Sequence, residues 1–555
     1  METNPRSILY MFRSLLDELA DMVFTVRREV ADWSHSFPPM SYGTAVVVGF
    51  VLLLLLLVFG YSRRVGKKKT LPPGPFAFPV IGNLFLVGKH PHVTFAKLAK
   101  QYGNIMRLHF GAVPVVIVSD ANMARELFSV QDMKFASRPI YDLMSTAYKY
   151  MNYGTDEEVS LAISEYGPKV RDLRQLCTTE LFTQRKIDMK KSVRAEEIQR
   201  MFGKIKTMIR DEEPVEIRPI VSEFSLRISC RTTFNKAFLN FENLPWRPGA
   251  LHPQAFRNME TENTKLLGEH QILDMIPMLK FVLERFDVFG INARWKEVSA
   301  LKEECTRPVI EWYRKHSSDD ESTLDFVEVL LRLSEEGKLS KTCVKSLILE
   351  LLTAGSDTIA SVLEWTLLEL VRHPHCMERL SAEIDGFFGT NRPVDEDELT
   401  KLPYLQAVAK EVLRLHNPTT LGIPHSNMEE ATLAGYHLPA RTTVLANFWA
   451  ISRDPTTWGQ DALTFNPDRF LACDLNVNGT NYEYLPFGAG RRICPGRAVA
   501  MRVLAAAIGS FVHAFEWSAL PGVELNANEG KDGLNIRPET PLVLKLSPRP
   551  SAMLY

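Results

Sequence analysis

The stretch FGAGRRICPG, residues Phe487–Gly496, decides the fold, and an apolar run with helical spacing, AVAMRVLAAAIGSFV at residues 498–512, follows it. The two glycines before Cys494 permit positive φ angles and therefore a tight loop, and Pro495 suits the first turn of the next helix. Backbone N–H groups and the N-terminus of that helix can then stabilise a thiolate at Cys494. Most lone cysteines are inert core residues, so it is the sequence around Cys494, and not the cysteine alone, that indicates a functional site.

A second informative stretch is VKSLILELLTAGSDTIASVLEWTLLELV, residues Val344–Val371, which contains no proline. Its length predicts a helix that crosses the core. The polar centre AGSDT, Ala354–Thr358, is unusual because a glycine inside a helix costs up to about 1 kcal/mol relative to alanine. Two interpretations stay open: a kink that opens a groove for a small ligand and a water, or a polar step on a surface face. The apolar flanks favour the first.

The remaining body is predicted to be mainly α with minor β. Apolar residues at 3.6-residue spacing dominate from about residue 180 onward. Candidate strands such as VPVVIVS at 113–119 and TTVLANFW at 442–449 are few and short. No linker or repeat divides this part of the chain, so we expect a single large domain.

Composition excludes some classes of function. The 555 residues include 65 basic and 66 acidic side chains, and a formal charge of −1 gives no support for a nucleic-acid partner. Seven cysteines are scattered without a CxxC pair or the close spacing of zinc ligands. This set of cysteines favours free thiols in a reducing compartment.

A membrane anchor is predicted near the N-terminus. Residues 44–61, TAVVVGFVLLLLLLVFGY, run for 18 residues without a charge, which nearly suffices to cross a bilayer. The alternative is a secretory signal peptide, but the run is long for one and starts deep in the chain. Five basic residues between Arg63 and Lys69 follow the run, so the positive-inside rule places everything after it in the cytosol.

The anchor divides the chain into four parts. Residues 1–43 would be lumenal, and their apolar spacing predicts an amphipathic helix, which leaves open a helix on the membrane or a solvated extension. Residues 62–83 combine the basic run with LPPGPFAFPVIGN and read as a stiff, proline-rich hinge. Residues 84–555 would form the catalytic domain.

The loop around the cysteine resembles a known family. Phe487, Gly490, Arg492, Cys494 and Gly496 match the FxxGxRxCxG haem-binding loop of the cytochrome P-450 family. The resemblance implies a helical haem-thiolate domain that holds haem b, iron protoporphyrin IX. In it, Cys494 would be the axial thiolate ligand of the haem iron. Phe487 would pack beside the sulfur, and Arg492 would hold a haem propionate.

Further motifs follow in the family's order. Glu411 and Arg414 form an ExxR pair on one helix face. Arg469, within FNPDRF at residues 465–470, is similar to the family's PERF element and would complete a Glu-Arg-Arg cluster near the haem. Breaking such a buried cluster would leave uncompensated charge, at roughly 3 to 5 kcal/mol.

The polar centre of the long helix also matches. AGSDT is similar to the family's AGx(D/E)T oxygen-activation motif, in which Thr358 would hydrogen-bond dioxygen at the haem and Asp357 would help to relay protons. Arg174, within YGPKVRDLRQLC, and His425, within IPH, align with the family's propionate contacts.

The resemblance extends from about Leu71 to the carboxyl terminus and is closest to the plant A-type branch. Three departures stand out. Val170 replaces a tryptophan that usually reaches a propionate, Asn417 replaces a proline, and Asp468 replaces the glutamate of PERF.

The implied reaction takes dioxygen and two NADPH-derived electrons and inserts one oxygen atom into a substrate. The chain has no GxGxxG motif, so the electrons would come from a membrane-bound NADPH-dependent flavoprotein reductase. Arg491, Arg497 and Arg502 form a basic docking face or are simply solvated charges. The resemblance and the anchor together imply a single-pass protein of the endoplasmic reticulum membrane that faces the cytosol.

Substrate specificity is expected to lie in the segment after Ser137, the helix around 351–356, the loop 419–423 and residues 534–538. These segments are mostly apolar or hydroxylic, which favours a small hydrophobic or phenolic substrate such as a phenylpropanoid, flavonoid or terpenoid. The alternatives are a haem-thiolate isomerase or dehydratase and a non-catalytic haem-binding protein. The intact Asp357 and Thr358 argue against both, and the cytosol-facing anchor argues against the isomerase.

Overall fold

The computed structural model divides the chain by its contacts into Met1–Lys69 and Thr70–Tyr555. The predicted extension 1–43, the predicted spanning helix 44–61 and residues 62–69 of the hinge lie outside the described residues. The structure describes residues 70–145, 148–149, 160–210, 213–242, 256, 259–260, 262–263, 266, 274–276, 287, 290–316, 324–530 and 535–555.

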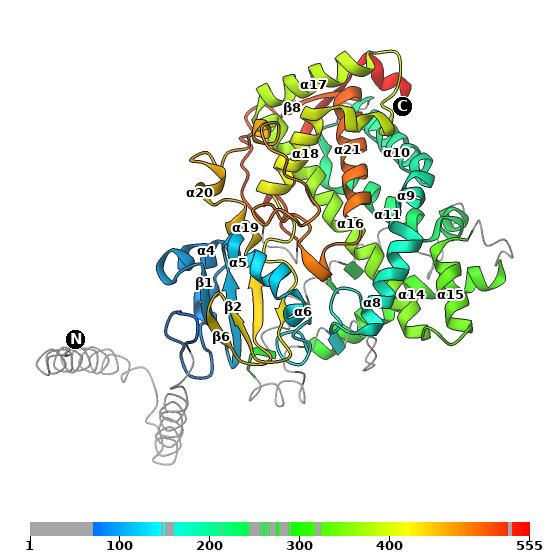
Figure 1. Ribbon diagram of the computed structural model, residues 1–555. Helices are drawn as coiled ribbons and strands as arrows, with labels where there is room; N and C mark the ends of the chain where they lie inside the picture. The colour runs from blue at the N-terminus through cyan, green and yellow to red at the C-terminus, as the bar shows by residue number, and fades with distance from the viewer. Residues whose placement is uncertain are drawn as a thin grey trace, which may run out of the picture. The chain divides into compact units, whose positions relative to one another are not determined.

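Helices dominate the described body, as the sequence predicts (Figure 1). The α-helices are α3 (Leu84–Val87), α4 (Pro91–Tyr102), α5 (Ala121–Arg125), α6 (Asp132–Phe135), α8 (Pro168–Cys177), α9 (Gln184–Met189), α10 (Lys191–Arg210), α11 (Ile217–Glu242), α14 (Ile291–Lys315), α15 (Phe326–Glu335), α16 (Lys341–Arg372), α17 (Pro374–Phe388), α18 (Pro403–Leu415), α19 (Phe448–Ile451), α20 (Pro455–Trp458) and α21 (Arg497–Ala514). Short π-helical turns are η1 (Glu126–Val130) and η2 (Thr178–Phe182), and short 3₁₀ turns are η4 (Glu396–Lys401), η5 (Pro467–Phe470), η6 (Gly490–Arg492) and η7 (Pro550–Leu554).

The strands form three small sheets, ordered β1-β2-β7-β4, β3-β9-β8 and β5-β6. Both predicted strands are confirmed in position, and they are parallel neighbours with Val115 opposite Thr443. The second is shorter than predicted, because α19 begins at Phe448. The strands are β1 (Ile105–Phe110), β2 (Val113–Val118), β3 (Val215–Glu216), β4 (His425–Ser426), β5 (Ala431–Leu433), β6 (Tyr436–Leu438), β7 (Thr443–Ala446), β8 (Phe515–Ala519) and β9 (Val543–Pro548).

The long helix α16 spans the body, and it is slightly longer than the predicted 344–371. The side chain of Ser340 caps its start by accepting the N–H of Cys343, and Pro374 follows its end. Figure 1 shows α16 passing through the body, and it packs against α11, α18 and α21. A helix of this length carries residues from one side of the domain to the other.

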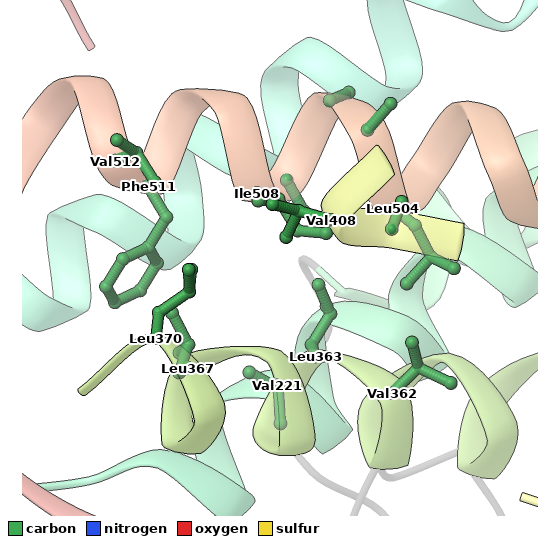
Figure 2. Close-up of a cluster of buried hydrophobic side chains, with 14 of the residues drawn as sticks. Val221, Val362, Leu363, Leu367, Leu370, Val408, Leu504, Ile508, Phe511 and Val512 are labelled. Carbon is green, nitrogen blue, oxygen red and sulfur yellow. The ribbon is translucent and has the colours of Figure 1, made fainter. Parts of the chain in front are cut away.

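The core joins α16 to the helix that follows the cysteine loop. Figure 2 shows Leu363 and Leu367 of α16 facing Leu504, Ile508 and Phe511 of α21 across a cluster of buried apolar side chains. Burying apolar surface stabilises this packing by about 25 cal/mol per Å². The loop before α21 and the centre of α16 are therefore fixed relative to each other by the same core.

Two described helices, α16 and α21, are long and apolar enough to cross a membrane. Most of each is buried inside the body, as is usual for core helices.

The proline-rich residues at the start of the described body are attached to it. The carbonyl oxygen of Thr70 accepts the N–H of His437, and that of Pro73 accepts the N–H of Arg107 at 2.7 Å. The second half of the predicted hinge is therefore hydrogen-bonded to β1 and β6, which belong to two different sheets.

Candidate active site

The loop before α21 has the conformation that its glycines predict. Gly488 and Gly490 have φ angles of 70° and 65°, and a Cβ atom on Gly490 would lie 2.4 Å from the carbonyl oxygen of Phe128. The N–H of Cys494 donates to the carbonyl oxygen of Phe487 at 3.0 Å and closes the loop. The prediction for Pro495 was wrong, because α21 begins at Arg497 and the proline lies in the preceding turn.

The sulfur of Cys494 lies at the N-terminus of α21. Burial raises the pKa of the Cys494 thiol, while backbone N–H groups of Gly496 and Arg497 and the charge of Arg174 partly offset that rise. The loop thus supplies the predicted donors, but burial outweighs them. A bound metal ion would bring about the deprotonation, because a thiol ligates as the thiolate.

Arg492 belongs to this loop, and Arg174 lies beside it. The buried Arg492 donates to carbonyl oxygens of Ala136 at 2.7 Å and of Leu161 at 3.0 Å. Arg174, on α8, donates to the carbonyl oxygen of Ile493 at 2.6 Å. Arg174 therefore reaches the loop from a distant part of the sequence, and Arg492 connects the loop to the segments of Ala136 and Leu161.

Arg138 and His425 complete this group. Arg138 is buried and donates to carbonyl oxygens of Ala162 at 2.7 Å and of Ile423 at 2.9 Å. His425 Nδ1 is 2.8 Å from the carbonyl oxygen of Phe135. We call Arg138, Arg174, Arg492 and His425 the arginine cluster.

The arginine cluster concentrates positive charge in a buried place. Burial and the charges of Arg492 and Arg174 lower the pKa of Arg138. Burial and the charge of Arg138 lower the pKa of His425 well below its usual value, so that this imidazole is neutral near pH 7. The hydrogen bonds above run to carbonyl oxygens, which carry no full charge. Such a site suits a ligand with carboxylates, and the two propionates of haem fit it, with Cys494 as the ligand to the iron.

The sequence analysis missed Arg138. The signal was an arginine in an apolar setting, FASRPI at residues 135–140, just after the serine with which the predicted substrate segment begins. Val170, which replaces a tryptophan, is fully buried in α8 and offers no polar atom to the cluster. The described cluster therefore has three arginines and no tryptophan donor at that position.

Glu350 of α16 holds the segment that faces the arginine cluster. Its carboxylate accepts the N–H groups of Leu161 at 2.9 Å and Ala162 at 2.6 Å and the hydroxyl of Ser160 at 3.1 Å. The carbonyl oxygens of Leu161 and Ala162 in turn accept from the arginines. Burial raises the pKa of Glu350, although these donors oppose the rise. Nothing in the sequence pattern had indicated this carboxylate.

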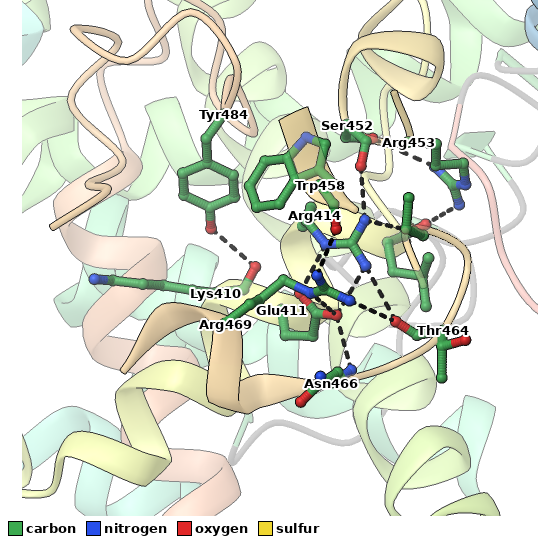
Figure 3. Close-up of polar contacts among 12 residues, drawn as sticks. Lys410, Glu411, Arg414, Ser452, Arg453, Trp458, Thr464, Asn466, Arg469 and Tyr484 are labelled. Atoms are coloured by element: carbon green, nitrogen blue, oxygen red, sulfur yellow. Dashed lines mark hydrogen bonds and ion pairs between the residues drawn. The ribbon is translucent and has the colours of Figure 1, made fainter. Parts of the chain in front are cut away.

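The predicted Glu-Arg-Arg cluster forms, and its first two members are fully buried (Figure 3). Arg414 makes a bidentate pair with Glu411, at 2.7 and 2.8 Å, and Arg469 Nε donates to the same carboxylate at 3.1 Å. Arg414 also donates to the carbonyl oxygens of Ser452 and Ala462. The cluster therefore ties α18 to the loops before and after α20.

The other two departures from the family pattern lie outside this cluster. Asn417 is buried, and its side-chain oxygen accepts the N–H of Thr419 at 2.9 Å. Asp468 is exposed and pairs with Arg379. Neither replacement removes a contact of Glu411.

On α16, one residue of the polar motif, Ala354, is exposed although α16 is buried on both sides of it. The Thr358 hydroxyl donates to the Ala354 carbonyl oxygen at 2.8 Å. Asp357 forms an ion pair with Arg537 and accepts a hydrogen bond from Asn535 at 2.6 Å. The two predicted oxygen-site residues thus differ. Thr358 is hydrogen-bonded within α16, whereas Asp357 is bound by residues near the carboxyl terminus.

The glycine of this motif is explained by packing. Every residue of the motif is helical, so the predicted kink is absent from α16. A Cβ atom on Gly355 would lie 2.5 Å from the hydroxyl oxygen of Ser229 on α11, and the Ser225 hydroxyl donates to the Gly355 carbonyl oxygen at 3.0 Å. Glycine therefore allows α11 to approach α16 closely.

Comparisons with known proteins agree with this geometry. The cytochrome P450 family model matches residues 72–546. Flavonoid 3'-monooxygenase of Arabidopsis thaliana is 33% identical over 92% of this chain and 98% of its own length, and cytochrome P450 71A14 of the same plant is 33% identical over 90% and 97%. Flavonoid 3'-monooxygenase CYP75B137 of Crocosmia x crocosmiiflora is also 33% identical, over 92% and 98%.

Solved structures share the fold. A zebra fish cytochrome P450 with abiraterone has a TM-score of 0.66 at 24% identity and covers 83% of this chain and 99% of its own. A family match over most of the chain and relatives above 30% identity settle the assignment. The chain therefore belongs to the cytochrome P450 family and is a monooxygenase that uses haem b, dioxygen and electrons derived from NADPH.

Proposed function

We propose that this monooxygenase hydroxylates a small hydrophobic or phenolic secondary metabolite of the phenylpropanoid, flavonoid or terpenoid kind. The observation that carries the proposal is the exposed position of Ala354 on α16, with Thr358 and Asp357 beside it. Two relatives named flavonoid 3'-monooxygenase, each matched over almost its whole length, support a phenolic substrate.

In this proposal Cys494 ligates the haem iron, and Arg138, Arg174, Arg492 and His425 hold the propionates. Bound haem supplies the redox-active iron that activates dioxygen. Thr358 and Asp357 hold and deliver the protons that the reaction consumes. The Glu-Arg-Arg cluster has no part in the chemistry and stabilises the fold.

The substrate would contact the segments that meet near α16. Arg138 donates to the carbonyl oxygen of Ile423, which joins two of the predicted substrate segments. The carbonyl oxygen of Ile536, in a third segment, accepts from Ser361 and Trp365 of α16. These contacts bring two of the segments together and attach a third to α16. The proposal places a substrate pocket, mostly apolar in composition, among the four segments.

The proposal also includes an electron donor and a membrane. The donor is an NADPH-dependent flavoprotein reductase. Of the three arginines suggested for docking, Arg491 pairs with Asp132, and Arg502 lies within 4 Å of carboxylates of Asp188 and Glu396. Their charge is partly neutralised, so the basic face would depend mainly on Arg497 and on the exposed part of Arg491.

For the membrane, the proposal keeps residues 44–61 as a single spanning helix in the endoplasmic reticulum. Residues 1–43 would be lumenal and residues 84–555 cytosolic. Residues 62–83 would form the hinge, whose second half is hydrogen-bonded to the body.

The first test is the carbon monoxide difference spectrum of the reduced protein, compared between the intact chain and Cys494→Ala. We expect the red-shifted Soret band of a thiolate-ligated haem only in the intact chain. A folded, haem-containing intact chain without that band would overturn the ligand assignment.

The second test is turnover. A library of phenolics and terpenoids is screened for spectral shifts of the haem, and binders are then assayed with NADPH and a plant reductase. A hydroxylated product that depends on NADPH supports the proposal. A rearranged or dehydrated product formed without NADPH would support an isomerase or dehydratase, and binding without turnover would support a non-catalytic protein.

A further inference from the structure

A second carboxyl group lies at the polar motif of α16. The described residues of segment 256–266 are helical, and among them Glu260 is buried. The Ser356 hydroxyl, one residue before Asp357, donates to Glu260 Oε1 at 3.0 Å. A carboxyl group from outside α16 therefore contacts the motif directly.

The buried surroundings of Glu260 favour its protonated form. Burial raises the pKa of Glu260 to about 7, although the hydrogen bond from Ser356 and the charge of Arg537 oppose the rise. Near neutral pH this carboxyl group is therefore present in both protonation states. An ordinary exposed glutamate would be fully ionised there.

Arg537 interacts electrostatically with both carboxyl groups. It forms the ion pair with Asp357, and the negative charge of Glu260 also acts on it. Arg218 of α11 adds positive charge nearby and is itself paired with Glu364 at 2.9 Å. The other charged residue described on the segment of Glu260, Glu262, pairs with Arg294 of α14.

Asp357 is strongly restrained by these contacts. One of its oxygens pairs with Arg537, and the other accepts from Asn535 at 2.6 Å. An adjacent cation favours the ionised form of a carboxyl group and so makes it a poor proton acceptor. A relay that passes through Asp357 needs this effect of Arg537 to be weakened.

We propose that Glu260 is a positioning residue for Asp357 and acts through Arg537. When Glu260 is ionised, it shares the guanidinium with Asp357, which raises the affinity of Asp357 for a proton. When Glu260 is neutral, Arg537 interacts with Asp357 alone and keeps Asp357 ionised. Glu260 exchanges no atom with the substrate. The inference rests on the proposed relay role of Asp357.

The experiment is a double-mutant cycle with Glu260→Gln and Arg537→Gln in the haem-loaded full chain. NADPH oxidation and hydrogen peroxide release are measured with dioxygen and a plant reductase, without organic substrate, in H₂O and D₂O. We expect E260Q to slow NADPH oxidation about fivefold and to enlarge the solvent isotope effect. In the R537Q background the same change is expected to have no effect.

The pH profile gives a second readout. Between pH 6 and 8 the rate of the intact protein is expected to rise as Glu260 ionises, whereas the rate of E260Q stays flat over that range. Glu262→Gln is the matched control, because it removes a carboxylate of the same segment and should leave the pH profile unchanged.

The outcomes distinguish the inference about Glu260 from the proposed relay role of Asp357. Asp357→Asn is measured in parallel, with the carbon monoxide spectrum as the check on folding and haem binding. If D357N slows the reaction and E260Q does not, the inference about Glu260 is overturned while the proposed relay stands. If D357N has no effect, the proposed relay itself fails. An equal effect of E260Q in both Arg537 backgrounds would show that Glu260 does not act through Arg537.

Discussion

In the Glu-Arg-Arg cluster the chain supplies its own carboxylate, whereas in the arginine cluster it supplies almost only cations. Glu411 accepts from both Arg414 and Arg469, so the buried charges compensate one another on folding. Arg138 and Arg492 donate instead to backbone carbonyl oxygens. Burial lowers the pKa of Arg138, and the charges of Arg492 and Arg174 lower it further. Both clusters are buried, and both contain arginines from distant parts of the sequence.

The difference separates a stabilising site from a binding site. Burying a cation raises the free energy of the folded state. The charge of Glu350 acts on Arg174 and Arg492 and offsets part of that cost, and a bound anion would offset more of it. The first cluster is complete when the chain folds. In the proposed function the two propionates of haem complete the second, so haem binding would contribute to the stability of the segments that carry it.

The largest effect on this contrast is expected for Glu411→Gln, which removes the carboxylate of the Glu-Arg-Arg cluster and leaves its two arginines. The buried Arg414 would lose its carboxylate partner, and Arg469 would keep only its ion pair with Asp461. We expect the free energy of unfolding to fall by about 3 to 5 kcal/mol. Denaturant unfolding and the yield of haem-bound protein measure it. A loss below about 1 kcal/mol would mean that the cluster does not depend on the carboxylate.

A third group of charged residues, Glu529 with His92 and Arg453, also contains its own carboxylate, and its contribution to stability can be tested by changing the pH. Burial alone would raise the pKa of Glu529, but its hydrogen bond with His92 at 2.6 Å and the charge of Arg453 lower it to about 2. The folded pKa lies below the unfolded one, so the contribution is present above about pH 4.5 and is lost as the pH falls towards 2.

We therefore expect Glu529→Gln to destabilise the protein by about 3 kcal/mol near pH 7. The difference between the intact protein and E529Q should stay constant from pH 8 to 5 and shrink below about pH 4.5. Urea unfolding at several pH values measures it. A difference that does not shrink on acidification would assign the effect to lost packing.

The arginine cluster is tested by Arg138→Gln and Arg492→Gln. In the proposed haem site each variant removes a charged donor to a propionate. We expect haem to dissociate roughly 10 to 100 times faster, since such a bond contributes about 1.5 to 3 kcal/mol. Transfer of haem to a haem-scavenging globin measures the rate.

The control is Arg379→Gln, which removes an exposed arginine that pairs with Asp468. It should leave the rate of haem loss unchanged. If R138Q loses haem no faster than R379Q, Arg138 is not part of the haem site.

The smallest effect is expected for Asp468→Asn, the position at which the sequence departs from PERF. Its carboxylate is exposed and pairs with Arg379 outside the cluster. An exposed ion pair contributes little, so the free energy of unfolding should change by less than about 0.5 kcal/mol. A loss comparable with that of E411Q would mean that Asp468 belongs to the cluster after all.

Much of the site could be predicted because its motifs are local. The two glycines before Cys494 dictate the loop, the spacing of Glu411 and Arg414 puts them on one helix face, and a long apolar run without proline predicts α16. Each of these depends on residues a few positions apart. Backbone propensity and side-chain reach therefore suffice to determine them.

Three features depended on the tertiary structure. Arg138 joins Arg492 although the two lie far apart in the sequence, Asp357 is restrained by Arg537, and Gly355 is explained by Ser229 of another helix. The sequence shows that these residues can carry charge or lack a side chain, but it does not show what faces them. Charge compensation, burial and close packing are properties of segments brought together on folding, so only the folded chain decides them.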